Sequence, residues 1–395
     1  MVFLRHLRIF GAVVIAGLLA ASCVGLPLDS SWGDISLIGS TPNIMLAFSD
    51  KIVQVDPTDG TLITLLDANG NVRVDEAGKP RPWQVQVTGG SPTHFYTRPI
   101  QLDTDTLLAA DYESKLLEID PARAEVTSPS GVTLPGHVVG NPLLTETALY
   151  IPLSDGGLVA LNPTDWSQIW HFTSDDGKGV WSQPLLLDGT MYVSSMNHFL
   201  YALDPAEVNT DQTPVEKWNL DLEGAIASSP TYANDALYVG SFAHKVFKVS
   251  LDGSIVAEFP TNGWVWGAPA VAGDMVYVAD LAGYIYALRD TGSALEEVWS
   301  RKVANGAIRM MPLVSGDTLV VGSRDHFVYW IDRQTGEEIR KQETRGEVLS
   351  DILLIEPNDA VREPTIVVST LAPEELLVAF SLDSGDRRWV YPHSS

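Results

Sequence analysis

The sequence predicts an all-β chain that folds as an eight-bladed β-propeller of four-stranded antiparallel blades. The first observation is a recurring pattern, "MYVSSMNHFLYALDP" from Met191, which returns as "LYVGSFAHKVFKVSLDG" from Leu237 and "VYVADLAGYIYALRDTG" from Val276. Repeats of about 20–50 residues are typical of stacked or radial folds, because one unit cannot bury its apolar faces alone. The second observation is that apolar residues alternate with a period of two in these segments, which favours strands over helices.

The number of units follows from the residue that opens each repeat. Successive openers are 64, 43, 42, 46, 39, 43 and 40 residues apart, so the chain holds eight units. An insertion at about Asp67–Pro82 explains the long first interval, and Asn69-Gly70 within it predicts a hairpin turn. The aligned openers are Ile35, Pro99, Pro142, Pro184, Pro230, Pro269, Pro312 and Ile352.

Each unit reads as four strands in a fixed order. An opening apolar strand precedes a strand of the type "(L/V/M)-Y-V-x-S", then a strand of the type "h-Y-A-L-D", then an outer strand that often carries an aromatic residue. Four-stranded antiparallel units repeated four to eight times describe propeller blades, which expose only short edges. Unit eight runs from Ser350 to Tyr391 and unit one starts at Trp32, so we expect little or no strand exchange between the two ends. The predicted outer-strand aromatic residues are Trp83, Trp170, Trp218, Phe259, Trp299 and Trp389.

Residues 1–22 read as the signal peptide of a lipoprotein. Arg5 and Arg8 precede an apolar run that is too short for a permanent membrane span, and small residues lead to Cys23. Cys23 is the only cysteine, so a disulfide does not explain it, and we expect it to be lipidated. The alternative is a chance cysteine after an ordinary signal peptide. The expected organisation is a signal peptide (1–22), a lipidated tether (23–30) and the propeller (31–392).

The repeats resemble those of the quinoprotein-type, or PQQ-like, family, whose pattern is roughly A-x-D-x-x-T-G-x-x-x-W. The segments Tyr286–Trp299, Phe380–Trp389 and Trp330–Ile339 carry this pattern, and Leu161–Trp170 and Val55–Leu62 match it more loosely. The resemblance covers about 31–391 and implies the propeller fold. It does not decide the function, because propellers include both enzymes and scaffolds.

With its lipidated cysteine, the chain is also similar to the BamB family of outer-membrane assembly lipoproteins. That resemblance implies a non-catalytic, monomeric propeller that binds protein partners in the cell envelope, including the β-barrel assembly machinery. It further implies export and anchoring to a membrane through lipid. We expect the outer membrane, facing the periplasm, if the source has one, and otherwise the outer face of the plasma membrane.

The charge of the chain excludes one class of partner. The formal net charge is −25, and it becomes −27 without residues 1–22, which hold two arginines and no acidic residue. So acidic a surface repels nucleic acid and anionic lipid headgroups. We therefore expect no nucleic-acid partner.

The sequence offers little support for catalysis or metal binding. Quinoprotein dehydrogenases hold their quinone against a disulfide between adjacent cysteines, and this chain has one cysteine and no C-x-x-C-H haem motif. His198, His244 and His326 occupy one repeated slot that elsewhere holds Gly or Ser, which predicts a turn residue with positive φ rather than a metal ligand. The acidic start of the Asp67–Pro82 insertion lacks the glycine and the final glutamate of a calcium loop. We expect no cofactor and no metal.

The candidate binding residues lie just before the opening strands. In a propeller the first strand of each blade is innermost, so the residues one and three positions before each opener should ring one mouth of the central channel. Aromatic and arginine side chains are enriched at recognition surfaces. The alternative is that these tryptophans wedge between neighbouring blades. The candidate partner- or ligand-binding residues are Trp32, Tyr96, Arg98, Trp181, Trp264, Trp266 and Arg309.

Two classes of function remain at this point. In the first, the protein is a lipid-anchored scaffold that binds other proteins without transforming them. In the second, it is a cell-surface sensor that binds a small ligand, a sugar or a peptide at the aromatic mouth. A PQQ-type enzyme is a distant third.

Overall fold

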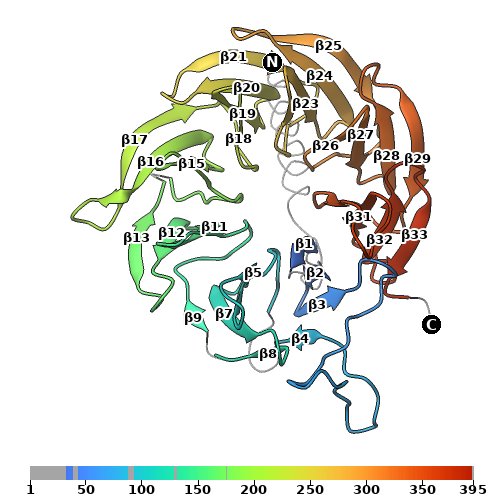
Figure 1. Cartoon of the computed structure of the whole chain (residues 1–395). Coiled ribbons are helices and arrows are strands. Elements are labelled where there is room, and N and C mark those ends of the chain that lie inside the picture. The colour runs from blue at the N-terminus through green and yellow to red at the C-terminus, as the bar shows by residue number, and fades with distance from the viewer. Residues whose placement is uncertain (1–32, 39–42, 88–92, 129–130, 175, 394–395) are drawn as a thin grey trace, which may run out of the picture.

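The structure is a computed structural model that describes residues 33–38, 43–87, 93–128, 131–174 and 176–393. These residues form eight antiparallel sheets arranged radially around one axis, and no helix occurs among them (Figure 1). The predicted fold class is confirmed. The predicted signal peptide, the tether with Cys23, and Trp32 lie outside the described residues.

The first four blades follow one another in chain order. Blade 1 comprises β1 (Asp34–Ile38), β2 (Asn43–Phe48), β3 (Lys51–Val55) and β4 (Gln84–Gln86). Blade 2 comprises β5 (Ile100–Gln101), β6 (Leu107–Ala110), β7 (Lys115–Asp120), β8 (Glu125–Val126) and β9 (Val132–Thr133). Blade 3 comprises β10 (Leu143–Leu144), β11 (Leu149–Leu153), β12 (Gly157–Leu161) and β13 (Gln168–Phe172). Blade 4 comprises β14 (Leu185–Leu187), β15 (Thr190–Ser194), β16 (Phe199–Val208) and β17 (Pro214–Asp221).

The last four blades repeat the same order. Blade 5 comprises β18 (Thr231–Ala233), β19 (Ala236–Ser241), β20 (Lys245–Ser250) and β21 (Ile255–Pro260). Blade 6 comprises β22 (Ala270–Ala272), β23 (Met275–Ala279), β24 (Tyr284–Asp290) and β25 (Leu295–Lys302). Blade 7 comprises β26 (Leu313–Ser315), β27 (Thr318–Gly322), β28 (Phe327–Asp332) and β29 (Glu338–Glu343). Blade 8 comprises β30 (Leu353–Ile355), β31 (Thr365–Ser369), β32 (Leu377–Ser381) and β33 (Arg387–Tyr391).

Blade 2 departs from the four-strand pattern. Its outer strand is split, because β8 pairs with the end of β7 and β9 pairs with the start of β7. The other seven sheets follow the simple order of first to fourth strand.

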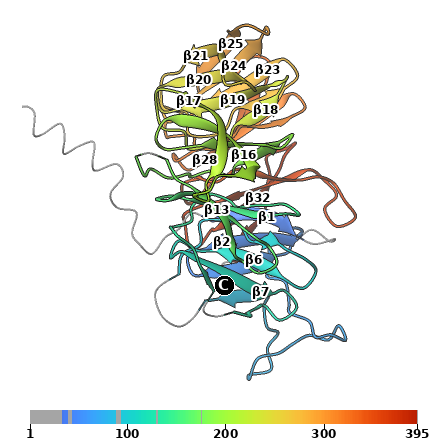
Figure 2. The same cartoon turned by 90° about the vertical axis from the view of Figure 1, so that its left-hand side faces the viewer.

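The alternation of strand direction gives the ring two distinct faces. The first strand of each blade lies nearest the axis and the fourth lies at the rim (Figure 1). Because the pairs are antiparallel, the turns between second and third strands and the links between blades lie on one face, which we call the link face. The turns between third and fourth strands, where the PQQ-like pattern falls, lie on the other, which we call the motif face. The ring is seen edge-on in Figure 2, with the blade 1 insertion projecting from its rim.

The hydrophobic core consists of layers between neighbouring blades. Second and third strands are almost wholly buried; every residue of β11 and β12 is buried, for example. One layer joins Met45 and Trp83 of blade 1 to Leu107 and Leu117 of blade 2. Since each blade buries its faces against its two neighbours, a single unit would be unstable alone.

The predicted outer-strand tryptophans connect each blade to the next. Each indole Nε1 donates a hydrogen bond, 2.7–3.1 Å long, to a backbone carbonyl after or within the third strand of the following blade. In four of the five pairs the strand register places an alanine of the third strand opposite the tryptophan, which leaves room for the indole. The pairs are Trp83 with Pro121, Trp170 with Pro205, Trp218 with Leu251, Trp299 with Arg333, and Trp389 with Pro57.

The glycine of the PQQ-like pattern lies directly against these tryptophans. Gly336 has φ +74°, and a Cβ built on it would lie 2.6 Å from a ring carbon of Trp299. Gly253 against Trp218 and Gly60 against Trp389 repeat this arrangement. The repeated glycine therefore serves both a left-handed turn and the close approach of the preceding blade's indole.

Phe259 lies on the outer strand β21, as predicted, but it does not occupy the position of the tryptophans. The register of β20 with β21 places Ala257 in that position, opposite Lys248. Lys248 crosses the junction instead, and its Nζ lies 2.8 Å from an oxygen of Asp290 and donates to the carbonyl of Gly292 in blade 6. A buried ion pair thus replaces the indole at this junction.

Two further junctions use other tryptophans. Trp330 of β28 donates to the carbonyl of Leu382 at 2.8 Å and connects blade 7 to blade 8. Trp166 of blade 3 donates in the opposite direction, to Glu118 of blade 2 at 2.6 Å. A side-chain hydrogen bond or ion pair therefore crosses each of the eight junctions.

The ring closes without strand exchange, as expected. All of blade 1 comes from the N-terminal part of the chain and all of blade 8 from the C-terminal part. Trp389 of blade 8 bonds to blade 1 as its counterparts do at four other junctions, and the hydroxyl of Ser369 donates to the carbonyl of Gly33 at 2.7 Å. Closure therefore depends on side-chain packing and not on a shared sheet.

Both turn predictions are confirmed. His198, His244 and His326 have φ values of 72°, 59° and 70°, and lie in the turns between second and third strands. The amide of Gly70 donates to the carbonyl of Asp67, which closes the turn predicted at Asn69-Gly70. The carboxylate of Asp67 accepts hydrogen bonds from the backbone amides of Asn69 and Asn71, so it stabilises this turn.

Candidate functional site

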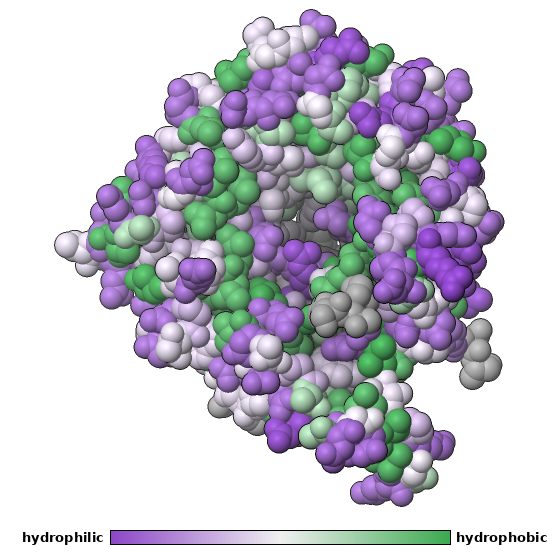
Figure 3. All heavy atoms as spheres, viewed as in Figure 1, coloured by the Kyte–Doolittle hydropathy of each residue, from purple (hydrophilic) through white to green (hydrophobic). Residues whose placement is uncertain are grey.

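A cavity of about 460 Å³ opens at the link-face end of the axial channel. Its lining includes the residue one position before the opener in all eight blades: Asp34, Arg98, Asn141, Gln183, Ser229, Ala268, Met311 and Asp351. The ring is hollowed along its axis in the space-filling view (Figure 3). The position predicted for the mouth from the repeat alignment therefore coincides with a real cavity.

The residues three positions before the openers also line this cavity. They are Tyr96, Val139, Trp181, Ala227, Trp266, Arg309 and Leu349. Trp32, the eighth, lies outside the described residues. Trp264 is not part of the lining: it stacks on Phe242 with ring centroids 4.9 Å apart, and 41% of its surface is exposed. Thus the structure brings together Tyr96, Arg98, Trp181, Trp266 and Arg309 and leaves Trp264 outside.

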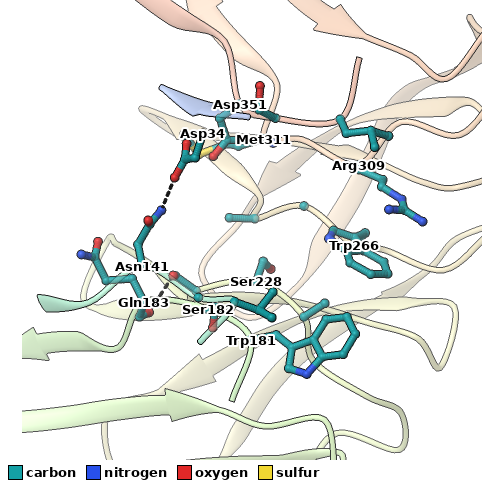
Figure 4. Close-up of a pocket in the computed structure, with 18 of the residues that line it drawn as sticks. Asp34, Asn141, Trp181, Ser182, Gln183, Ser228, Trp266, Arg309, Met311 and Asp351 are labelled. Atoms are coloured by element: carbon teal, nitrogen blue, oxygen red, sulfur yellow. Dashed lines mark hydrogen bonds between the residues drawn. The ribbon is translucent and has the colours of Figure 1, made fainter. Parts of the chain in front are cut away.

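One wall of the cavity is aromatic and cationic. The rings of Trp181 and Trp266 meet edge to face with centroids 6.1 Å apart, although they come from the links before blades 4 and 6. The guanidinium carbon of Arg309 lies 4.3 Å from the ring centroid of Trp266, a favourable cation–π geometry. Figure 4 shows these three side chains gathered on the same side of the cavity.

The opposite wall is polar and carries two carboxyl groups. Asn141 donates to Asp34 at 2.7 Å (Figure 4). The backbone amide of Met311 donates to Asp351 at 3.0 Å. Burial raises the pKa of Asp34, against the lowering effect of the Arg98 charge. Burial, and then the charge of Asp34, raise the pKa of Asp351. The two carboxyl groups are close enough to disfavour each other's ionisation.

The polar wall also divides the channel. Arg98 and Gln183 line a second cavity of about 530 Å³, together with the first strands of blades 1 to 3. Both residues belong to the positions directly before the openers. These positions therefore form the floor of the link-face cavity.

Two serines of the lining were not predicted. Ser182 and Ser228 stand two residues before the openers of blades 4 and 5. Neither Oγ has a hydrogen-bond partner among the described residues, and only 7% of Ser182 is exposed. Nothing in the repeat pattern distinguishes them, since serine is common in links between blades.

The tryptophans at the mouth differ from those at the blade junctions. Trp181 and Trp266 are half-buried and line the cavity, whereas Trp170 and Trp330 are fully buried between blades. The Nε1 of Trp181 makes only a long bond, 3.4 Å, to the carbonyl of Ser154. The expectation that mouth tryptophans wedge between blades therefore does not describe their position.

Within the described ranges, no three His, Cys, Asp or Glu side chains converge in a way that could hold a metal ion. In the same part of the chain, no helix has the length and apolar character that a membrane span requires.

The cavity does not fit the quinone for which the PQQ-like repeats are named. That quinone is a planar polycarboxylate. Quinoprotein dehydrogenases hold it against a disulfide between adjacent cysteines, and the described residues that line this cavity include no cysteine. No catalytic step through a quinone is derived for this site.

Comparison with known proteins agrees with the fold. A family model described as outer membrane protein assembly factor BamB matches residues 209–295 and 289–395. No curated protein matches the sequence.

Solved structures resemble this chain at low sequence identity. BamB from Moraxella catarrhalis is 15% identical with a TM-score of 0.63, over 88% of this chain and 95% of that one. Sqt1 from Saccharomyces cerevisiae is 12% identical with a TM-score of 0.64, over 87% and 94%. The computationally designed protein Ika8 is 14% identical with a TM-score of 0.61, over 90% and 98%. The chain is thus a β-propeller with PQQ-like repeats, and it is similar to BamB in fold and in the family match of residues 209–395.

Proposed function

We propose that this protein is a non-catalytic, lipid-anchored scaffold that acts outside the cytoplasm and binds proteins of the outer-membrane β-barrel assembly machinery. The observation that carries the proposal is the family match to BamB over blades 5 to 8. The sequence "LAASC" ending at Cys23, after a basic and then apolar segment, supports the lipid anchor. A rigid ring with many exposed turns suits a protein that holds partners without transforming them.

The anchor and the mouth belong to the same side of the ring in this proposal. Gly33, the first described residue, is bonded to Ser369 at the link-face end of β31. Nine residues lie between Cys23 and Gly33. A lipid on Cys23 therefore favours an orientation in which the link face is turned toward the membrane.

The blade 1 insertion is the partner-binding surface that we favour. It projects from the rim and exposes Leu66, Val72 and Val74 by 48%, 51% and 54% (Figure 2). Two isolated bridges, one between Leu66 and Val72 and one between Val74 and Pro80, hold it in a defined shape. A group of exposed apolar side chains on an otherwise acidic protein is suited to contact with another protein.

The test is a pull-down of the full-length protein from membranes of its native host, with identification of the bound proteins by mass spectrometry. We expect barrel-assembly proteins with the wild type. We expect fewer with Leu66→Ser/Val74→Ser, and no change with Val298→Ser, an equally exposed valine of β25. Labelling with a palmitate analogue should modify the wild type and not Cys23→Ser. Absence of both acylation and assembly proteins would refute the proposal.

A further inference from the structure

The link-face cavity has the size and the shape of a ligand site. Its volume of about 460 Å³ falls within the range of about 300–1,000 Å³ that is typical of small-molecule sites. Arg98 and Gln183, directly before their openers, line both this cavity and the second cavity beneath it, so the cup lies at the mouth of the channel. Its lining comes from non-repeating residues of all eight blades, which the repeat itself does not require.

The formal charges of the lining cancel. Arg98 and Arg309 contribute two positive charges, and Asp34 and Asp351 two carboxyl groups. A ligand with several negative charges would meet the carboxyl groups, and one with several positive charges would meet the guanidinium groups. Burial already raises the pKa of both aspartates, so additional charge in the cup would be costly. The lining therefore selects against highly charged ligands of either sign.

The aromatic wall favours a ligand with an apolar face. The indoles of Trp181 and Trp266 present carbon surface to the cup beside polar groups. A sugar ring has C–H faces that pack on indoles and a rim of hydroxyl groups. Aromatic side chains with a polar neighbour suit such amphipathic ligands.

The unpartnered serines supply a second, independent observation. Ser182 is more than nine-tenths buried and belongs to the lining, and its Oγ has no partner among the described residues. The Oγ of Ser228, also in the lining, is in the same situation. Hydroxyl groups both donate and accept hydrogen bonds, and leaving a buried one unsatisfied costs free energy. Each Oγ lies just below the accessible surface of the cavity, so rotation about χ1 is needed before it can bond to a ligand hydroxyl, in either role.

We propose that the link-face cavity binds a neutral carbohydrate of one to three rings, with a sugar face on Trp266 and Trp181 and sugar hydroxyls on Ser182 and Ser228. This site is separate from the scaffold role, because the insertion that we favour for partner binding lies at the rim. The two proposals therefore fail independently.

The test is calorimetric titration of the full-length protein, held in a detergent without a sugar headgroup. The probes are maltotriose and triacetylchitotriose, with succinate and spermidine as charged comparisons. We expect one or both sugars to bind with a dissociation constant of about 1 mM or lower, and neither charged probe to bind. Preference for triacetylchitotriose would indicate an N-acetylhexosamine polymer as the source, and preference for maltotriose a neutral hexose chain.

Three variants locate the binding. Trp266→Ala should weaken sugar binding about ten-fold or more. Ser182→Ala should weaken it about three-fold or more without a change in melting temperature, because its Oγ makes no bond within the described fold. Trp264→Ala, outside the lining, should bind as the wild type does. Failure of both sugars to bind, binding of a charged probe, or wild-type binding by Ser182→Ala would overturn the proposal.

Discussion

At the rim of the ring, five of the eight junctions use the same bond from an outer-strand indole to a carbonyl of the next blade, and three of these add the same glycine beneath the indole. Around the axis, the seven described positions three residues before the openers hold six different residue types. The rim positions are repeated because every junction solves the same packing problem. The mouth positions are free to differ because packing does not depend on them. The comparison separates residues that build the ring from those that give it a specific surface.

The largest effect should come from removing a junction tryptophan. Trp299→Ala deletes a buried indole and leaves a cavity between blades 6 and 7, so we expect a loss of about 3–5 kcal/mol in the free energy of unfolding. Chemical denaturation measures it. The control is Trp264→Ala, which removes an exposed indole and should cost about 1 kcal/mol or less. Equal losses in both variants would mean that the junction position of Trp299 adds nothing to the effect of removing an indole.

The glycine beneath the indole should have the next largest effect. Gly336→Ala combines the strain of a positive φ with a clash against Trp299, so we expect a loss of about 3 kcal/mol. Gly292 also has a positive φ, but nothing lies within 4 Å of its missing Cβ, because the slot that faces it holds Ala257 in place of a tryptophan. Gly292→Ala should therefore cost only about 1 kcal/mol. Thermal unfolding of the two variants side by side isolates the contribution of the indole contact.

A smaller, pH-dependent effect is expected from two buried aspartates that occupy equivalent positions in different blades but have different hydrogen-bond partners. Asp111 and Asp280 both end the second strand of a blade, at a position that is often serine, and both are buried. Asp280 accepts hydrogen bonds on both carboxylate oxygens. The Oδ2 of Asp111 has no partner among the described residues, and burial raises its pKa from 3.8 to about 6.

The sign of the pH effect follows from that shift. A carboxyl group with a raised pKa in the folded state destabilises the fold when it ionises, so the penalty is absent below about pH 4 and complete above about pH 6. Asp111→Asn should therefore raise the free energy of unfolding by about 1 kcal/mol at pH 7.5 and lose this advantage at pH 4. Asp280→Asn should lower it at pH 7.5, because an amide NH₂ would face bonded donors. Denaturation curves at both pH values decide; an advantage for Asp111→Asn that persists at pH 4 would contradict the assignment.

The smallest effect should come from the turn histidines. His244 is exposed, has φ 59°, and bonds through Nδ1 to the carbonyl of Asn262 at 3.1 Å. His244→Gly should change stability by about 0.5 kcal/mol or less, because relief of the left-handed strain offsets the lost hydrogen bond. His244→Val should be destabilising by about 1 kcal/mol or more, since a β-branched residue tolerates positive φ poorly. Melting temperatures check both; a large loss in His244→Gly would mean that the ring nitrogen has a role that a turn residue does not need.

The comparison of rim and axis also explains which features of the structure could be predicted from the sequence. Repetition along the chain predicted the eight blades, five of the junction tryptophans and the positive φ of the histidine slot, because each is a local rule applied many times. Lys248 at the junction of blades 5 and 6 was missed, because this pairing occurs once: Lys248 faces Ala257, where four other blades pair an alanine with a tryptophan. A rule learned from the repeats cannot supply such an exchange, and the ion pair with Asp290 depends on the next blade.

The axis was predictable in position but not in detail. The alignment placed Trp181, Trp266 and Arg309 at one mouth, and the structure brings them into a single wall. The alignment could not show that Trp264 stacks on Phe242 outside the cavity, because the direction of a side chain in a link depends on the neighbouring blades. The role of Ser182 was equally hidden, since only the assembled ring buries it.

One paired measurement tests most directly the claim that repeated residues build the ring and non-repeating residues at the axis bind. It records the unfolding free energy and the sugar affinity of Trp299→Ala and Trp266→Ala, with affinity measured at a temperature where both variants are folded. We expect Trp299→Ala to lose stability and keep the wild-type affinity, and Trp266→Ala to lose affinity and keep stability to within about 1 kcal/mol. If Trp266→Ala lost stability as Trp299→Ala does and bound sugar as the wild type does, the separation of rim from axis would be contradicted.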